Sequence, residues 1–127
     1  MNAESEYYMT NILVIDGNHE ITTMLKTILS SDTCRVQTAR SGRYGLQVLR
    51  TYPFDVVITD IVMPEADGFD VITEINRMQQ RPRVIAMTGG TARLSREYLS
   101  VVANAQSVHQ VLYKPFSIDE LLDSVFI

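Results

Sequence analysis

Four polar residues stand at the ends of short apolar runs, and their types together suit phosphoryl chemistry. They are Asp16, Asp60, Thr88 and Lys114. An aspartate can act as a nucleophile and form an aspartyl phosphate, the role we assign to Asp60. A second carboxylate, Asp16, can help to hold Mg²⁺, which neutralises charge on the transferring group. The Thr88 hydroxyl and the Lys114 ammonium can both donate hydrogen bonds to phosphoryl oxygens.

These residues can act together only if the apolar runs before them are neighbouring strands. Four of the runs are short and mainly apolar. The runs at 12–15 and 84–87 are nearly continuous in apolar residues, and that at 54–58 holds only one charge, which is typical of parallel strands covered on both faces. A weaker run alternates between apolar and polar residues and predicts an edge strand. The five predicted strands cover residues 12–15, 35–39, 54–58, 84–87 and 108–112.

Between the predicted strands, apolar residues recur at spacings of three and four, which indicates helices with one apolar stripe. Five such segments are found, at residues 21–29, 44–49, 69–75, 94–102 and from Ser117 to the end of the chain. Pro53 is expected to end the second helix. Ser117 and Glu120 form a capping-box pattern at the start of the last one.

Strand and helix therefore alternate five times, which predicts right-handed crossovers and an open parallel sheet with helices on both faces. Five strands suit the doubly wound order 2-1-3-4-5, in which the site lies at the carboxyl ends of the strands. All four polar residues would then face one crevice. We assign residues 1–10 to an amino-terminal tail and residues 11–127 to one domain.

The composition excludes several classes of protein. A length of 127 residues suits one domain, and a net charge of −4 argues against a broad basic surface for nucleic acid. With one cysteine, an internal disulfide is impossible. We find neither a signal peptide nor an apolar run long enough to span a bilayer, so we expect no membrane contact and a cytoplasmic location.

A small flavin or nucleotide enzyme could use the same crevice of this fold. Such sites favour a loop rich in Gly, Ser or Thr after the first strand, where backbone N–H groups bind phosphate. Here that loop, residues 16–20, has acidic ends and a single glycine. It carries no nucleotide-binding fingerprint, so this alternative is disfavoured.

The motifs around the four residues resemble those of a response-regulator receiver domain of bacterial two-component signalling. The matching segments are NILVID (11–16), TDIVMP (59–64) with DG (67–68), MTG (87–89) and KPF (114–116). The resemblance implies a flavodoxin-like receiver fold and a signalling module rather than an enzyme. It also implies phosphorylation of Asp60 by a histidine kinase or phosphotransfer protein, Mg²⁺ dependence, and a cis bond between Lys114 and Pro115.

The resemblance also implies a metal site and a set of partners. Asp16, Asp60 and the backbone carbonyl of Val62 would hold Mg²⁺, and Glu20 could reach back to assist. A downstream protein would bind the face made by the fourth helix, fifth strand and fifth helix. Because the chain stops at Ile127, it resembles a stand-alone receiver, a monomer or weak dimer that contacts proteins rather than nucleic acid.

Three departures from the family pattern keep a second hypothesis open. Gly17 stands where the family has a second acidic residue, so Mg²⁺ binding should be weakened. Val111 replaces the usual switch aromatic, and Tyr113 is expected to be only a half-buried strand residue. Thr88 and Lys114 are 26 positions apart, about one helical turn more than is usual. The alternative is therefore a phosphate-independent pseudo-receiver that acts as a protein-binding module.

Overall fold

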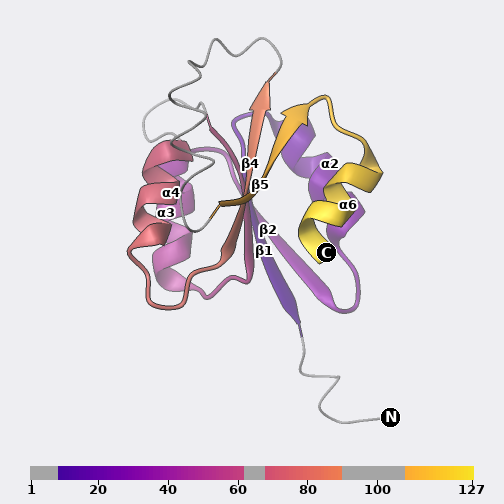
Figure 1. Cartoon of the computed structure of the whole chain (residues 1–127). Helices are drawn as coiled ribbons and strands as arrows, with labels where there is room; N and C mark the ends of the chain where they lie inside the picture. The colour runs from indigo at the N-terminus through magenta and orange to yellow at the C-terminus, as the bar shows by residue number, and fades with distance from the viewer. Residues whose placement is uncertain (1–8, 62–67, 90–107) are drawn as a thin grey trace, which may run out of the picture.

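The computed structural model describes residues 9–61, 68–89 and 108–127, and its centre is a five-stranded parallel sheet (Figure 1). The strands are β1 (Thr10–Ile15), β2 (Cys34–Ala39), β3 (Val56–Asp60), β4 (Arg83–Gly89) and β5 (Val108–Lys114). Their order is β2-β1-β3-β4-β5, so the predicted doubly wound order is confirmed and the weak, alternating strand lies at an edge.

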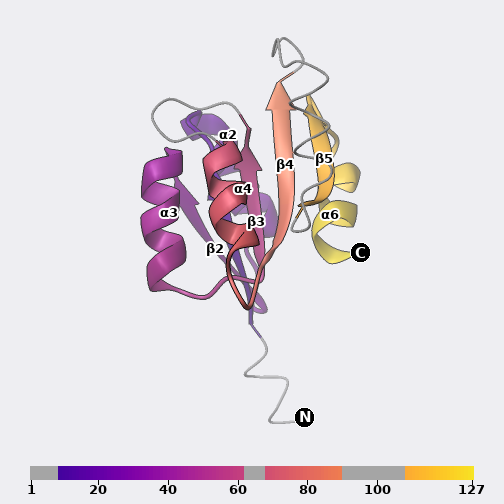
Figure 2. The ribbon, with the colours of Figure 1, turned by 60° about the vertical axis from the view of Figure 1, so that its left-hand side comes forward.

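Among the described residues, two helices cover each face of the sheet (Figure 2). They are α2 (His19–Leu29), α3 (Gly42–Thr51), α4 (Gly68–Asn76) and α6 (Ile118–Phe126). The helices α2 and α6 lie on one face, and α3 and α4 lie on the other. The helix predicted over residues 94–102 and the tail before residue 9 lie outside the described residues, so four of the five predicted helices are seen.

The core consists of two apolar layers, one under each pair of helices. Ile12 and Val14 of β1 pack in the α2–α6 layer, whereas Leu13 and Ile15 pack in the α3–α4 layer. All four of these side chains are fully buried. Successive side chains of a strand point to opposite faces, and here both faces are covered by helices. Consecutive residues of the central strands are therefore apolar.

Three strands extend further at their carboxyl ends than the apolar pattern predicts. β3, β4 and β5 continue through Asp60, Gly89 and Lys114, which the sequence places beyond the apolar runs. The parallel ladder accounts for this, because Asp60 pairs with Met87 and Gly89 pairs with Lys114 in register. Polar residues at these positions are therefore held by the sheet backbone rather than by loops.

The helix starts follow the capping chemistry of the sequence. Ser117 and Glu120 form the predicted capping box at the start of α6. Asn18 caps α2, and its side-chain oxygen accepts hydrogen bonds from the backbone N–H groups of Glu20 and Ile21. Within the described parts of the chain, no helix is long and apolar enough to cross a membrane.

Candidate functional site

Asp16, Asp60 and Lys114 form one hydrogen-bonded cluster at the carboxyl end of the sheet. The Lys114 ammonium donates to Asp16 Oδ2 at 2.7 Å and to Asp60 Oδ2 at 3.3 Å. Asp16 is buried, with 2% of its surface exposed, while Asp60 and Lys114 are partly exposed. Residues 98 and 54 positions apart in sequence therefore meet in one partly exposed cluster of charges, which we call the charged pocket.

Strand alternation explains why these three side chains meet. Successive side chains of a strand point to opposite faces, so residues two apart share a face. Asp16, Asp60 and Lys114 each come two residues after a member of the α2–α6 layer, namely Val14, Ile58 and Leu112. All three charged groups thus continue the same face of the sheet beyond its apolar part.

The loop after β1 fixes the Asp16 carboxylate. Its Oδ1 accepts a hydrogen bond of 2.8 Å from the backbone N–H of Asn18, and its Oδ2 is bound to Lys114. Asn18 is also the residue that caps α2. The cap of the helix and the position of the buried carboxylate are therefore set by the same residue, a role that the sequence pattern did not reveal.

The environment of Lys114 favours its charged form. Burial by itself lowers the pKa of the Lys114 ammonium, but the hydrogen bond to Asp16 and the negative charges of Asp60 and Asp16 raise it by more. The net effect is a pKa above the usual lysine value. The pocket therefore holds a permanent positive charge between two carboxylates, which relieves the repulsion expected of Asp16 and Asp60 alone.

Thr88 lies beside this cluster but continues the other face of the sheet. It follows Met87, the β4 partner of Asp60, and it is buried. Ala86, two residues earlier, packs in the α3–α4 layer, so alternation places Thr88 on that side. The structure therefore brings Thr88 to the same end of the sheet, on the α3–α4 side of the strand next to Asp60.

Two glycines allow helices to approach the strands that carry the carboxylates. A Cβ on Gly68 would lie 2.7 Å from Ile61 Cα and closer still to the carbonyl oxygen of Asp60. The Gly68 N–H donates to the Ile61 carbonyl at 2.9 Å, which anchors the start of α4 beside Asp60. A Cβ on Gly45 of α3 would lie 2.9 Å from Ile15 Cγ1. The sequence suggested only a turn and helix start at Gly68 and no role for Gly45.

The donor set fits a weakly held Mg²⁺ rather than a closed cation site. Mg²⁺ commonly takes one or two protein carboxylates and completes its shell with water and substrate oxygens. Asp16 and Asp60 supply two carboxylates, and both already contact Lys114. Glu20 is exposed in the first turn of α2, and no group of three potential metal ligands occurs among the described residues. Val62 lies outside the described residues.

The remaining positions that the sequence singled out are placed as follows. Val111 is partly buried against the α3–α4 layer. Tyr113 is 59% exposed, so the expectation of a half-buried ring was wrong. It lies on edge strand β5, where it pairs in register with Thr88. The Lys114–Pro115 bond is cis, as the resemblance implied. A Cβ on Gly89 would meet nothing within 4 Å.

The fold and this pocket define a doubly wound α/β domain of the flavodoxin-like class, with its site at the carboxyl end of the sheet. The family comparison is more specific. Residues 12–126 match the response regulator receiver domain family, and the chain belongs to that family. It is thus a receiver domain of the kind found in two-component response regulators.

Individual relatives agree with this assignment. The response regulator SaeR of Staphylococcus aureus is 28% identical over 114 residues, which cover 90% of this chain and 48% of SaeR. The chain thus spans about half the length of the curated relatives it matches. A receiver domain structure from Clostridium thermocellum is 30% identical with a TM-score of 0.78, covering 92% of this chain and 91% of that one. The signal receiver domain of an HD domain-containing protein from Pseudomonas fluorescens is 25% identical with a TM-score of 0.81, covering 92% and 91%.

Proposed function

We propose that this domain accepts a phosphoryl group on Asp60 from a histidine kinase or phosphotransfer protein and thereby switches a protein-binding face. The observation that carries the proposal is the Lys114 ammonium, which contacts both Asp60 and the buried Asp16. A carboxylate nucleophile with a fixed cation beside it is suited to attack phosphorus and to bind the phosphoryl group afterwards.

The transfer step can be written with the residues present. An Asp60 carboxylate oxygen attacks the phosphorus of a phosphohistidine, the O–P bond forms, the P–N bond breaks, and the leaving imidazole nitrogen takes up a proton. Lys114 donates to the phosphoryl oxygens, on which negative charge is concentrated. Thr88, one residue beyond the β4 partner of Asp60, would add a hydroxyl donor if its side chain turns from the α3–α4 side toward the phosphoryl group.

Asp16 and Asp60 would hold Mg²⁺ in this reaction, which would neutralise part of the charge on the phosphoryl group. The backbone carbonyl of Val62 and the side chain of Glu20 stay proposed as additional ligands. Since Asp16 is also the closer partner of Lys114, we expect its carboxylate to serve both cations. Weak Mg²⁺ binding is the expected consequence of Gly17.

The output of the switch would be a change of the protein-binding face near β5 and α6. A new dianionic group at Asp60 would compete for Lys114, whose strand carries the exposed Tyr113. We propose that the downstream protein binds this side of the domain, together with the predicted fourth helix. Local charge biasing a neighbouring loop and strand is a common switching mode.

Intact-mass analysis after treatment with acetyl phosphate tests the proposal. The wild type should gain about one phosphoryl mass in the presence of Mg²⁺, and Asp60→Asn should gain none, since the amide cannot act as the nucleophile. Omitting Mg²⁺ should reduce the gain. A folded wild type that takes no phosphate from either acetyl phosphate or a phosphorylated histidine kinase would contradict the proposal.

A second candidate function is a phosphate-independent binding module, and two observations favour it. Gly17 removes one carboxylate from the pocket, and Val111, partly buried, has no hydroxyl or ring to move between interior and solvent. In that case a partner captured by the wild type would bind Asp60→Asn equally well, before and after acetyl phosphate treatment. Binding that rises on phosphorylation would exclude this alternative.

A further inference from the structure

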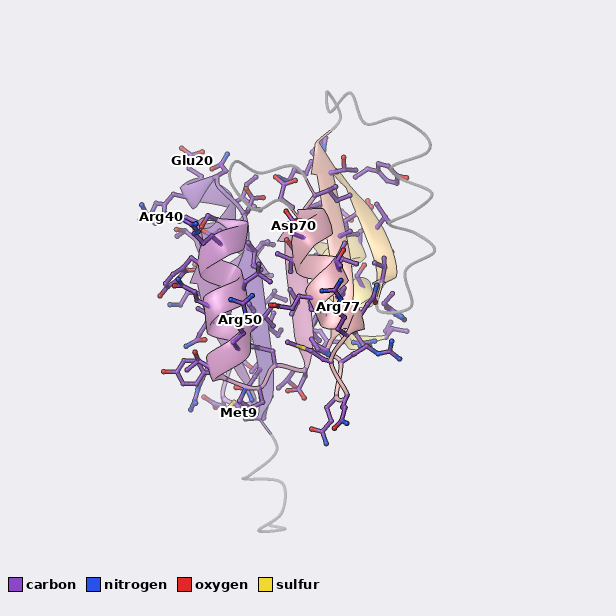
Figure 3. All side chains as sticks on the ribbon, turned by 90° about the vertical axis from the view of Figure 1, so that its left-hand side faces the viewer. Met9, Glu20, Arg40, Arg50, Asp70 and Arg77 are labelled. Atoms are coloured by element: carbon purple, nitrogen blue, oxygen red, sulfur yellow. The ribbon has the colours of Figure 1, made fainter. Side chains whose placement is uncertain are left out.

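Five of the eleven basic residues of this acidic chain lie within residues 21–54. Residues 21–54 hold five Lys or Arg and one acidic residue, a net charge of +4 in a chain of net charge −4. All five basic side chains are exposed. They are Lys26, Arg35, Arg40, Arg43 and Arg50. These residues belong to α2, β2, α3 and the β2–α3 loop, and β2 is the edge strand opposite to β5 (Figures 2 and 3).

A groove runs along β2 among these elements. One cavity, of about 330 Å³, is lined by residues of α2, β2 and α3 that include Lys26, Thr38 and Tyr44. A second cavity, of about 280 Å³, is lined by residues that include Asn11 and Arg35. Both cavities are lined by Gln37 and Tyr52 and therefore adjoin each other, and we call the two together the β2 groove.

Aromatic side chains form one wall of the β2 groove. Tyr44, Val48 and Tyr52 follow one another at spacings of four residues, which places them on the same side of α3 and its end. Tyr44 and Tyr52 are each more than half exposed, at 53% and 54%. Exposed tyrosines beside a groove are typical of protein-binding sites, because the ring packs against a partner while the hydroxyl stays hydrogen-bonded.

The floor of the groove is the edge strand β2. Of the described strands, β2 is the last on this side of the sheet, and it pairs only with β1. The outer edge of such a strand presents backbone N–H and C=O groups that an added strand can pair with. Arg35 and Gln37 alternate with the buried Cys34 and Val36, so the exposed side chains of β2 line the groove.

We propose that the β2 groove binds an extended, acidic segment of a partner protein, which adds to the edge of β2. Lys26 on one cavity and Arg35 on the other would pair with acidic side chains of that segment. The only acidic residue within 21–54 is Asp32, and Asp55 beyond them is engaged by the backbone N–H of Asn11 at 2.8 Å. The two cavities are thus lined by cations and by no carboxylate.

Two other occupants fit the groove less well. A second copy of this chain pairing β2 with β2 would bring Arg35 and its neighbours against one another, and like charges at a strand pair are destabilising. A single-stranded nucleic acid would bind the cations but would leave the outer backbone N–H and C=O groups of β2 without hydrogen-bond partners. An acidic peptide uses the backbone edge, the cations and the tyrosines together.

A peptide titration followed by ¹⁵N–¹H NMR on the full chain tests the proposal. The probe is an acetylated and amidated peptide of alternating Glu and Val, about eight residues long, enough to cover the six residues of β2. Binding should shift the amide signals of β2 and α3 and weaken with added salt. The same peptide with Lys in place of Glu should not bind.

Charge-reversal variants localise the binding. Arg35→Glu and Lys26→Glu should each lower the affinity for the peptide about tenfold, because an attraction between opposite charges becomes a repulsion between like charges. Arg77→Glu makes the same chemical change at an exposed residue just after α4 (Figure 3) and should leave the affinity unchanged. Unchanged spectra confirm that each variant folds.

Three results would overturn the proposal. They are no peptide binding, signal shifts confined to other elements, and equal weakening by Arg77→Glu and Arg35→Glu. A thymidine oligonucleotide that binds the groove more tightly than the peptide would also overturn it in favour of nucleic acid. The proposal does not depend on Asp60, and Arg35→Glu should still accept phosphate, so its failure is distinguishable from that of the phosphoacceptor role.

Discussion

The charged pocket at the carboxyl end of the sheet and the β2 groove use charge in contrasting ways. In the pocket, a buried carboxylate of Asp16 and a partly exposed carboxylate of Asp60 share one ammonium group, that of Lys114. In the groove, Lys26 and Arg35 are exposed to solvent. One region has its charges paired within the molecule, and the other presents charges of one sign to the outside.

The difference follows from the energetics of burial. A charge removed from water must be paired and hydrogen-bonded, or the group changes its protonation state. An exposed charge has no such requirement and contributes little to stability, but it can attract a charged partner over about a Debye length. Under the two proposals, the pocket would hold a small phosphoryl group at a fixed point, whereas the groove would recruit a larger acidic ligand.

The largest expected effect is that of removing the cation from the pocket. Lys114→Met should lower the free energy of unfolding by about 3 kcal/mol at neutral pH, because the buried Asp16 loses its charged partner. Arg35→Met in the groove should change it by less than about 0.5 kcal/mol. Urea unfolding followed by circular dichroism measures both. Equal effects of the two substitutions would contradict the contrast between the regions.

The pH dependence of the same pair of proteins gives a second test of Lys114. Its pKa is raised in the folded state, so its stabilising contribution is complete below the pKa of an unfolded lysine, about 10.4, and is lost as the pH rises through the higher folded value. The difference in unfolding free energy between wild type and Lys114→Met should stay constant from pH 7 to about pH 10 and shrink above it. A difference that grows in this range would refute the assignment.

The next effect concerns the glycine beside Asp60. Gly68→Ala should destabilise the domain by about 2 kcal/mol and slow phosphate uptake, since the new Cβ would collide with the backbone of Asp60 and Ile61. Gly89→Ala is the matched control, because its Cβ would enter open space. Thermal unfolding and intact-mass time courses compare the two. A Gly68→Ala protein as stable and as reactive as the control would show that the close approach is unimportant.

A smaller effect, an increase in Mg²⁺ affinity, is expected from adding a carboxylate at position 17. A Cβ at Gly17 would meet only the Arg40 carbonyl oxygen, at 3.7 Å, so Gly17→Asp is sterically permitted. The substitution should tighten Mg²⁺ binding about tenfold, or about 1.4 kcal/mol, as measured by isothermal titration calorimetry. Gly17→Asn adds similar bulk without charge and should have a much smaller effect. Equal Mg²⁺ affinity in wild type and Gly17→Asp would show that position 17 does not face the metal.

The smallest effect is expected at the exposed ion pair between α3 and α4. Arg50 and Glu74 are joined at 2.6 Å, but the Arg50 side chain is 60% exposed. Arg50→Ala should therefore lower the free energy of unfolding by only about 0.5 kcal/mol, and the difference from wild type should be smaller still at high salt. Urea unfolding at low and high ionic strength checks this. A decrease in the free energy of unfolding of several kcal/mol that does not depend on salt would show that the Arg50–Glu74 pair behaves like a buried ion pair instead.

The sequence was sufficient to predict the sheet order and the meeting of Asp16, Asp60 and Lys114. Both predictions depend on local patterns, namely apolar runs that alternate with helical stripes and polar residues at the ends of the runs. The same reasoning also placed Thr88 in the same crevice, whereas alternation along β4 puts it on the α3–α4 side. The edge position of β2 and the capping box at Ser117 followed from equally local signals.

Other features depend on contacts between distant segments and had no local signal. A Cβ at Gly68 would collide with the backbone of Asp60 and Ile61, and one at Gly45 with the side chain of Ile15. These close contacts arise only when α4 and α3 pack on the strands. The exposure of Tyr113 depends on its place on the edge strand β5, which the preference of strands for tyrosine does not reveal. The net charge of −4 likewise did not indicate the net charge of +4 in residues 21–54, which include β2, α3 and most of α2.

The most direct test of the central claim is to locate the phosphoryl group chemically. The domain would be treated with acetyl phosphate and Mg²⁺ and then reduced with borohydride, which converts an aspartyl phosphate to homoserine, before peptide mass spectrometry. The account predicts conversion at Asp60 alone, with Asp16 unchanged beside Lys114. Conversion at Asp16 or at another carboxylate, or none in a folded protein, would contradict it.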